Sequence, residues 1–218
     1  MRIENVKAVI FDMDGTLIDT EKIYLKIWPQ TMAEMGYEYG EDKCLFMRSL
    51  GSPFALAQMK KWFGDDFDYE KAKARRKVLF DEHIAEHGIQ KKKGAVELLD
   101  FLRKQGIMTA VATATDIERT TEYLKMTDLY DQFDRIISAT MVKEGKPSPY
   151  VYEYVCRELG LSPAECIAVE DAPNGILSAS RAGLRVIMVP DMTGPDEELS
   201  KHLTACVESL DMVIDLLK

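Results

Sequence analysis

The sequence has no long apolar run, since its longest apolar stretches extend over only a few residues. A helix that crosses a bilayer needs about 20 predominantly apolar residues, so no membrane span is expected. The N-terminus also lacks a cationic segment followed by a sustained apolar one, which is the pattern of a secretory signal peptide. We therefore expect a cytoplasmic protein that does not interact with membranes.

Basic residues are outnumbered by acidic ones. The chain has 28 Lys and Arg against 37 Asp and Glu, which gives a formal net charge of -9. Because nucleic-acid binding depends on clustered cations, this balance argues against a nucleic-acid partner and favours a small molecule. Nothing in the sequence decides the oligomeric state, and a monomer is the default expectation.

The side chains that bind zinc are also scarce. The four cysteines lack C-x-x-C spacing, so reduced thiols are a better interpretation than a disulfide framework or a zinc knuckle. The segment from His83 to His87 matches the H-x-x-E-H pattern of inverted zinc proteases. It falls on a charged helical segment remote in sequence from the other acids, which favours a solvated helix face.

The chain of 218 residues is long enough for one or two domains. Residues 18–89 show helical patterns and no strand signal, with Pro29 predicted to kink or divide the first helix and Thr20 predicted to cap it. Short apolar strands alternate with helices elsewhere, which is typical of a parallel sheet covered on both faces. We predict an α/β core of residues 1–17 and 90–218 with an all-helical insertion, and expect the strands at 8–11, 107–112, 135–137, 166–169 and 185–189.

Two carboxylates follow the first predicted strand directly, in the segment from Asp12 to Thr16. Asp12 and Asp14 are two residues apart, so on extended backbone they point the same way. Two like charges about 4 Å apart repel by roughly 4 kcal/mol near a protein surface, so the pair needs a cation, a shared proton or solvent. Taken alone, the segment is also compatible with a solvated turn.

Other polar groups follow later strands, where ligands of open α/β sheets bind. Thr113 and Ala114 come where a helix begins, a geometry suited to a phosphate oxygen but also to a simple helix cap. Lys146 is able to reach an anion, although a surface lysine is the usual alternative. Glu170 and Asp171 form a second acidic pair, and ligands made only of oxygen select Mg²⁺ rather than zinc.

Taken together, these segments resemble the haloacid dehalogenase superfamily, and most closely its β-phosphoglucomutase-like branch of small phosphatases and mutases. The match rests on four segments in the same order: 12–16, Thr113, 145–149 and 170–183. It implies a Rossmann-like core with a helical cap domain, residues 18–89, that closes over the site. The implied activity is Mg²⁺-dependent hydrolysis of a small phosphomonoester, expected to be a sugar phosphate.

The resemblance also implies a role for each matching residue. Asp12 would be the nucleophile that forms an aspartyl-phosphate, and Asp14 the general acid and then the base. Thr113, Ala114 with nearby backbone amides, and Lys146 would hold the phosphoryl oxygens. The Mg²⁺ ligands would be Asp12, the backbone carbonyl of Asp14, and Asp171 with Glu170, directly or through water.

Several departures bear on the activity. The β-phosphoglucomutases have a histidine where this chain has Tyr24 and commonly a valine where it has Thr16, so a phosphatase is favoured over a phosphosugar mutase. Tyr150 replaces an aspartate that usually follows the lysine motif. A true dehalogenase would lack Asp14, and a non-catalytic phosphometabolite-binding protein would not need all of these acids.

Specificity is expected to come from the cap. Arg48 and Arg76 are candidate substrate contacts whose cations could bind a second phosphate or carboxylate. Arg48 is equally compatible with a surface position, and the run from Lys71 to Lys77 that contains Arg76 is most simply a solvated helix face.

Overall fold

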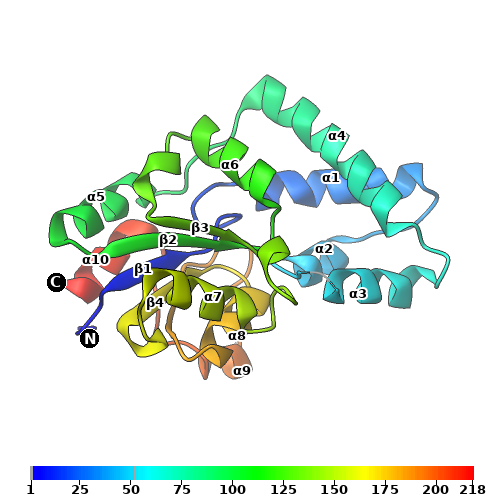
Figure 1. Cartoon of the computed structure of the whole chain (residues 1–218). Helices are drawn as coiled ribbons and strands as arrows, with labels where there is room; N and C mark the ends of the chain where they lie inside the picture. The colour runs from blue at the N-terminus through cyan, green and yellow to red at the C-terminus, as the bar shows by residue number, and fades with distance from the viewer. Residues whose placement is uncertain (1, 52) are drawn as a thin grey trace.

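A six-stranded parallel sheet forms the centre of the computed structural model, which describes residues 2–51 and 53–218 (Figure 1). All the strand pairs run parallel, in the order β3-β2-β1-β4-β5-β6. The strands are β1 (Ala8–Phe11), β2 (Met108–Thr113), β3 (Arg135–Ser138), β4 (Cys166–Glu170), β5 (Arg185–Met188) and β6 (Ala205–Cys206). This order is that of a Rossmann-like sheet, so the predicted fold class is confirmed.

Side chains of β1 alternate between two apolar layers, because successive residues of a strand point to opposite faces. Val9 and Phe11 pack into one layer, whereas Ala8 and Ile10 pack into the other. The first layer is covered by α5 (Ala95–Gln105), α6 (Ile117–Met126) and α10 (Val213–Leu217). The second is covered by α7 (Tyr150–Leu159), α8 (Pro173–Arg181) and α9 (Glu197–Ser200). Both faces of β1 are therefore buried, which explains why its sequence is entirely apolar.

Among residues 2–51 and 53–218, four helices lie between β1 and α5, and we call them the helical insertion. They are α1 (Glu21–Glu34), α2 (Glu41–Met47), α3 (Phe54–Phe63) and α4 (Tyr69–His87). The insertion has an apolar cluster of its own, which includes Trp28, Met32 and Met59. The alternative of two short helices around Pro29 is wrong, because α1 runs through this proline without interruption.

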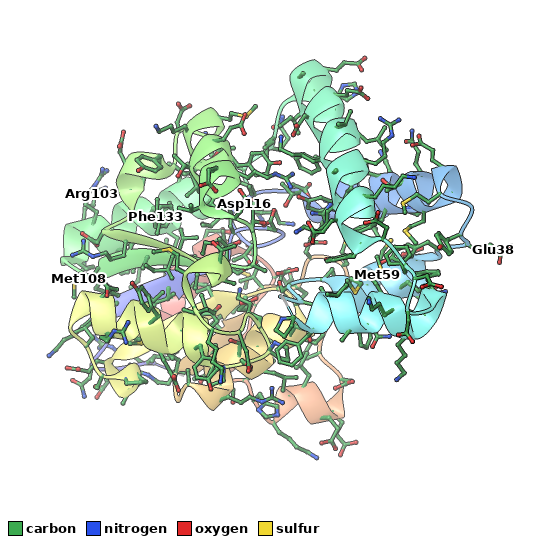
Figure 2. The ribbon with its side chains drawn as sticks, turned by 45° about the vertical axis from the view of Figure 1, so that its right-hand side comes forward. Glu38, Met59, Arg103, Met108, Asp116 and Phe133 are labelled. Atoms are coloured by element: carbon green, nitrogen blue, oxygen red, sulfur yellow. The ribbon has the colours of Figure 1, made fainter. Side chains whose placement is uncertain are left out.

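The chain enters and leaves the helical insertion through two adjacent segments. The Asp19 N–H donates to the Gln90 carbonyl at 2.8 Å, and the Lys92 N–H donates to the Leu17 carbonyl at 2.9 Å. Figure 2 shows Met108, the first residue of β2, far from the insertion, and Asp116, which follows β2, facing it. The carboxyl ends of the strands therefore point toward the helical insertion.

Short elements account for the remaining differences from the sequence prediction. The prediction omitted β6, which pairs with β5 over only two residues, and the strands predicted at 107–112 and 185–189 extend over Met108–Thr113 and Arg185–Met188. In the part of the chain that the structure describes, four 3₁₀ helices complete the fold: η1 (Tyr130–Gln132), η2 (Ala139–Met141), η3 (Pro163–Glu165) and η4 (Leu210–Met212). Across residues 2–51 and 53–218, no helix has the length and apolar character needed to cross a membrane.

Candidate active site

The charged residues that are buried as whole residues, among residues 2–51 and 53–218, lie at the carboxyl ends of the central strands or line the pocket next to them. These residues are Asp12, Asp14, Glu21, Arg48, Arg119, Lys146, Glu170 and Asp171. Asp12 follows β1, and Glu170 ends β4, the strand beside it. The strand order reverses at this point, which is where open α/β sheets bind their ligands. The fold therefore concentrates charge at its expected binding crevice.

The turn after β1 requires a glycine. Gly15 has a φ of +81°, in the left-handed region, and its N–H donates to the Ile18 carbonyl at 2.9 Å. A Cβ at this position would lie 2.6 Å from Oδ2 of Asp171. Glycine thus allows the turn that carries Asp12 and Asp14 to pass directly against the loop that follows β4.

Two hydroxyl groups hold the Asp14 carboxylate. Thr20 Oγ1 donates to Oδ1 and Thr115 Oγ1 donates to Oδ2, each at 2.7 Å. Thr20 occupies the N-cap position of α1 as predicted, but its side chain makes no capping bond because its hydroxyl binds Asp14 instead. Thr115 was outside the predicted site, although it is the next residue after Thr113 and Ala114.

Lys146 lies at the centre of the buried cluster. Its side chain is fully buried, and Nζ lies 2.5 Å from Asp12 Oδ1 and 2.6 Å from Glu170 Oε1. The Tyr152 hydroxyl of α7 also donates to Glu170 Oε1. The alternative of a surface lysine is therefore wrong, and Lys146 supplies positive charge to two of the predicted acids at once.

Three carboxylates form a group that fits a metal ion. Asp12, Glu170 and Asp171 each offer an oxygen within 4.8 Å of the others. One buried oxygen of each, Oδ2, Oε2 and Oδ2 respectively, has no hydrogen-bond partner among the described residues. A set of oxygen ligands suits Mg²⁺, which prefers carboxylates. The side chain of Asp14 is directed to Thr20 and Thr115 and does not join this group.

These acids are buried with too few positive charges near them. Burial raises the pKa of Asp12 to about 8, and the Lys146 ammonium opposes this shift while Glu170 and Asp14 add to it. Burial likewise raises the pKa of Asp171 well above its usual range, with Asp12 contributing and Arg48 opposing. A carboxylate buried with too few counter-charges is costly to ionise, so a bound cation would stabilise the charged form.

Arg48, a predicted substrate contact, is buried rather than on the surface. Its Nη1 lies 3.5 Å from Asp171 Oδ2, and its Nη2 donates to Thr193 Oγ1 at 2.6 Å. Asn174 Nδ2, at the start of α8, donates to the Arg48 carbonyl at 2.9 Å. The helical insertion is therefore anchored to the core beside a predicted metal ligand.

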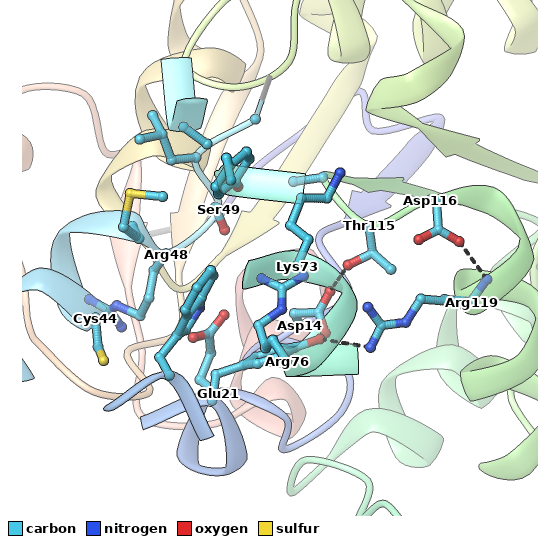
Figure 3. Close-up of a pocket in the computed structure, with 18 of the residues that line it drawn as sticks. Asp14, Glu21, Cys44, Arg48, Ser49, Lys73, Arg76, Thr115, Asp116 and Arg119 are labelled. Atoms are coloured by element: carbon cyan, nitrogen blue, oxygen red, sulfur yellow. Dashed lines mark hydrogen bonds between the residues drawn. The ribbon is translucent and has the colours of Figure 1, made fainter. Parts of the chain in front are cut away.

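A pocket of about 240 Å³ opens between the core and the helical insertion (Figure 3). Asp12, Asp14, Ala114 and Thr115 line it from the core. Tyr24, Trp28, Arg48, Lys73 and Arg76 line it from the insertion. Thr113, a predicted phosphate ligand, is fully buried, and its hydroxyl accepts a hydrogen bond from the Thr115 N–H at 3.1 Å.

Three further residues of the site, besides Thr115, were absent from the sequence prediction. Glu21 lines the pocket, and burial followed by the charge of Asp14 raises its pKa to about 8. Arg119 lines the pocket from α6, and Tyr152 binds Glu170 from α7. In sequence Glu21 is an ordinary acidic residue in the first turn of a helix, and neither Arg119 nor Tyr152 lies at a strand end.

Replacement of Gly175 by alanine tests the packing around Glu170. A Cβ at Gly175 would lie 2.1 Å from the Glu170 carboxylate, so that carboxylate must move. We expect Gly175→Ala to destabilise the fold by about 1–3 kcal/mol, the usual cost of overpacking, and to weaken Mg²⁺ binding. Urea unfolding and Mg²⁺ titration calorimetry measure the two effects.

Gly194→Ala is the control, since no atom lies within 4 Å of a Cβ at position 194. Equal stability and equal Mg²⁺ affinity of the two variants would contradict the prediction.

The sequence matches the family model of the haloacid dehalogenase-like hydrolases over residues 9–189. Protein CbbY of Rhodobacter capsulatus is 34% identical over 197 residues, which cover 85% of this chain and 86% of that protein. The phosphorylated carbohydrates phosphatase of Thermotoga maritima is 31% identical over 188 residues, which cover 84% of each. The crystal structure of CbbY from Rhodobacter sphaeroides in complex with phosphate has a TM-score of 0.81 and 26% identity, covering 95% of this chain and 96% of that one.

Proposed function

Because the chain belongs to the haloacid dehalogenase-like hydrolases, we propose that it is a Mg²⁺-dependent phosphatase that hydrolyses a small sugar phosphate through an aspartyl-phosphate. The main support is the position of Asp12, which both lines the pocket and belongs to the group of three acids. One carboxylate can therefore face a substrate and a cation together. The names of the relatives, which include a phosphorylated carbohydrates phosphatase, support the substrate class.

Asp12 acts as the nucleophile in this proposal. Its carboxylate oxygen forms a bond to phosphorus while the bond from phosphorus to the sugar oxygen breaks, which divides one displacement into two easier steps. Lys146, at 2.5 Å from Oδ1, orients the carboxylate and offsets its charge as the dianionic phosphoryl group approaches. The Ala114 segment at the end of β2 supplies backbone amides for the phosphoryl oxygens.

Asp14 acts as the general acid and then as the general base. It gives its proton to the departing sugar oxygen and later takes one from the water that attacks the aspartyl-phosphate, which releases inorganic phosphate and regenerates Asp12. The hydroxyls of Thr20 and Thr115 keep its carboxylate pointing along the pocket and away from the metal ligands.

Asp12, Glu170 and Asp171 would hold the Mg²⁺, since each has a buried oxygen that accepts no hydrogen bond from the described residues. When bound, the cation would neutralise charge on the transferring phosphoryl group. The backbone carbonyl of Asp14 is the further ligand that the family resemblance implies. Arg48 would help to balance Asp171, which it contacts.

Residues 18–89 serve as the cap in this proposal. The insertion has its own apolar cluster and is joined to the core by the two paired segments at 17–19 and 90–92. It also contacts the core near the site, where the Gly51 N–H donates to the Lys146 carbonyl at 2.9 Å. A cap of this kind excludes water from the reacting groups until the substrate is bound.

The direct test is phosphate release from a panel of sugar phosphates in the presence of Mg²⁺. We expect turnover with water as the acceptor, because Tyr24 replaces the histidine of the mutases. A mutase would instead convert β-glucose 1-phosphate, supplied with a catalytic amount of the bisphosphate, into glucose 6-phosphate faster than it releases phosphate. If the protein turns over none of these compounds, a phosphometabolite-binding protein is the better assignment.

Removal of divalent metal is expected to abolish turnover and to lower the melting temperature, with Mg²⁺ restoring both. A ligand at 100 times its Kd stabilises a protein by about 2.7 kcal/mol, or roughly 5–11 °C at this chain length. Differential scanning calorimetry with EDTA or Mg²⁺, at matched ionic strength, measures the shift. Full activity and an unchanged melting temperature in EDTA would exclude the proposed metal site.

A further inference from the structure

The Glu170 carboxylate accepts two hydrogen bonds on the same oxygen. The Tyr152 hydroxyl of α7 donates to Oε1, and Lys146 Nζ donates to the same atom at 2.6 Å. The other oxygen, Oε2, is buried and accepts no hydrogen bond from residues 2–51 and 53–218. The carboxylate is therefore held through Oε1, and Oε2 remains available to a ligand.

Close packing limits the movement of this carboxylate. A Cβ at Gly175 would lie 2.1 Å from it, so the backbone of α8 passes directly beside it. Lys146 Nζ also lies 5.3 Å from the centre of the Tyr152 ring, where the ring attracts the ammonium group. Tyr152 therefore contacts both members of the buried ion pair, Glu170 through its hydroxyl and Lys146 through its ring.

The hydroxyl of Tyr152 contributes little to the apolar packing. The residue is fully buried, and its ring belongs to the apolar layer that also contains Val151 and Val155. A phenylalanine would fill nearly the same space without bringing a polar group into this layer. Because a buried hydroxyl is costly unless it makes a hydrogen bond, its bond to Glu170 is the interaction that compensates for its burial.

We propose that Tyr152 is a positioning residue that holds Glu170 for the divalent cation and favours Mg²⁺ over Ca²⁺. This proposal rests on the Mg²⁺-dependent function proposed above. Mg²⁺ requires a near-octahedral set of ligands, whereas Ca²⁺ accepts about six to eight oxygens and often takes both oxygens of one carboxylate. With two donors on Oε1, Glu170 offers a cation only Oε2, which suits Mg²⁺ better than Ca²⁺.

Replacement of Tyr152 by phenylalanine separates orientation from charge. The variant keeps the ring, and it keeps Lys146, so the net charge around Glu170 is unchanged. What it loses is one of the two donors that hold Oε1. Groups that hydrogen-bond a metal ligand commonly change the metal affinity by about 10- to 100-fold, so the loss should be measurable.

The experiment is titration calorimetry with Mg²⁺ and with Ca²⁺, on the native chain and on Tyr152→Phe, without substrate. We expect the Kd for Mg²⁺ to rise about tenfold in the variant. The Kd for Ca²⁺ should rise by less than about threefold, since Ca²⁺ tolerates a reoriented carboxylate. The melting temperature of each protein in EDTA verifies that the fold is retained.

Tyr154→Phe is the matched control. Tyr154 lies on the same helix, is only partly buried, and has its ring 4.5 Å from the guanidinium carbon of Arg157. Its replacement should leave both Kd values within about twofold of the native ones, because its ring packs against Arg157 and not against the acids.

A double variant tests whether Tyr152 acts through Glu170. In a Glu170→Gln background, Tyr152→Phe should change the Kd for Mg²⁺ by less than about twofold, since the carboxylate that it positions is absent. A full tenfold loss in that background would overturn the proposal. Unchanged Mg²⁺ and Ca²⁺ affinities in Tyr152→Phe alone, or equal losses of the two, would overturn it as well.

These measurements need no turnover, which separates them from the test of the phosphatase function. If the native chain hydrolyses no sugar phosphate and Tyr152→Phe still weakens Mg²⁺ selectively, the phosphatase function fails and the role of Tyr152 stands. If the native chain releases phosphate and both proteins bind Mg²⁺ equally, the role of Tyr152 fails and the function stands. A native chain that binds no Mg²⁺ would overturn both.

Discussion

Replacement of Asp12 by asparagine is expected to lower phosphate release by at least about a thousandfold, because an amide does not attack phosphorus as a carboxylate does. The side chain keeps its shape, and its oxygen still accepts a hydrogen bond from Lys146, which lies 2.5 Å from Oδ1 in the native chain. The fold should therefore survive. Steady-state phosphate release with Mg²⁺ measures the loss, and circular dichroism verifies the fold.

Asp215→Asn serves as the control for Asp12→Asn. Asp215 is an exposed carboxylate on α10 that pairs with Lys218 at 3.2 Å, so its loss should change turnover by less than about twofold. A second measurement identifies the covalent step: brief exposure of the native chain to a ³²P-labelled substrate should label the protein, and Asp12→Asn should remain unlabelled. Undiminished turnover by Asp12→Asn would show that another group is the nucleophile.

Replacement of Lys146 by methionine is expected to destabilise the fold by about 3–5 kcal/mol, the usual cost of removing one partner from a buried ion pair. Methionine fills much of the same space, so the main loss is the positive charge that lies 2.5 Å from Asp12 and 2.6 Å from Glu170. Both carboxylates would remain buried with an unmatched charge. Turnover should also fall below detection, since Lys146 orients the proposed nucleophile.

Urea unfolding with and without Mg²⁺ tests the origin of this loss. If missing positive charge is the cause, Mg²⁺ should stabilise Lys146→Met more than it stabilises the native chain. Lys143→Met is the matched control, because Lys143 is exposed three residues away and should change stability by less than about 0.5 kcal/mol. A loss below about 1 kcal/mol for Lys146→Met, unaffected by Mg²⁺, would be inconsistent with a charge-balancing role.

Much of the sheet could be predicted because its central strands are buried on both faces. The run from Ala8 to Phe11 is entirely apolar for this reason, and the same holds for most of β2 and β4. The edge strand from Ala205 to Cys206 is too short to show a periodic pattern. The pairing of this strand depends on its contact with β5, and the local sequence does not encode that contact.

The site was harder to predict because burial and partners are tertiary properties. Lys146 is indistinguishable in sequence from a surface lysine, and only the family resemblance set it apart. Thr20 occupies a normal capping position, yet its hydroxyl turns to Asp14, six residues earlier across a tight turn. Arg119 looks like a solvated residue of an amphipathic helix, and its contact with Tyr24 of the helical insertion is visible only in the structure.

Because β1 lies in the middle of the sheet, the strands on both sides of it are synthesised after it. Asp12 and Asp14 are synthesised before Lys146, the cation that contacts Asp12 and follows it by 134 residues. At a synthesis rate of about 5–20 residues per second, the ribosome-bound chain contains these acids but not Lys146 for roughly 7–27 s. The β4 neighbour of β1 emerges later still. The proposed catalytic centre therefore assembles only after Asp171 has been translated, so products of interrupted translation that end before Asp171 lack it.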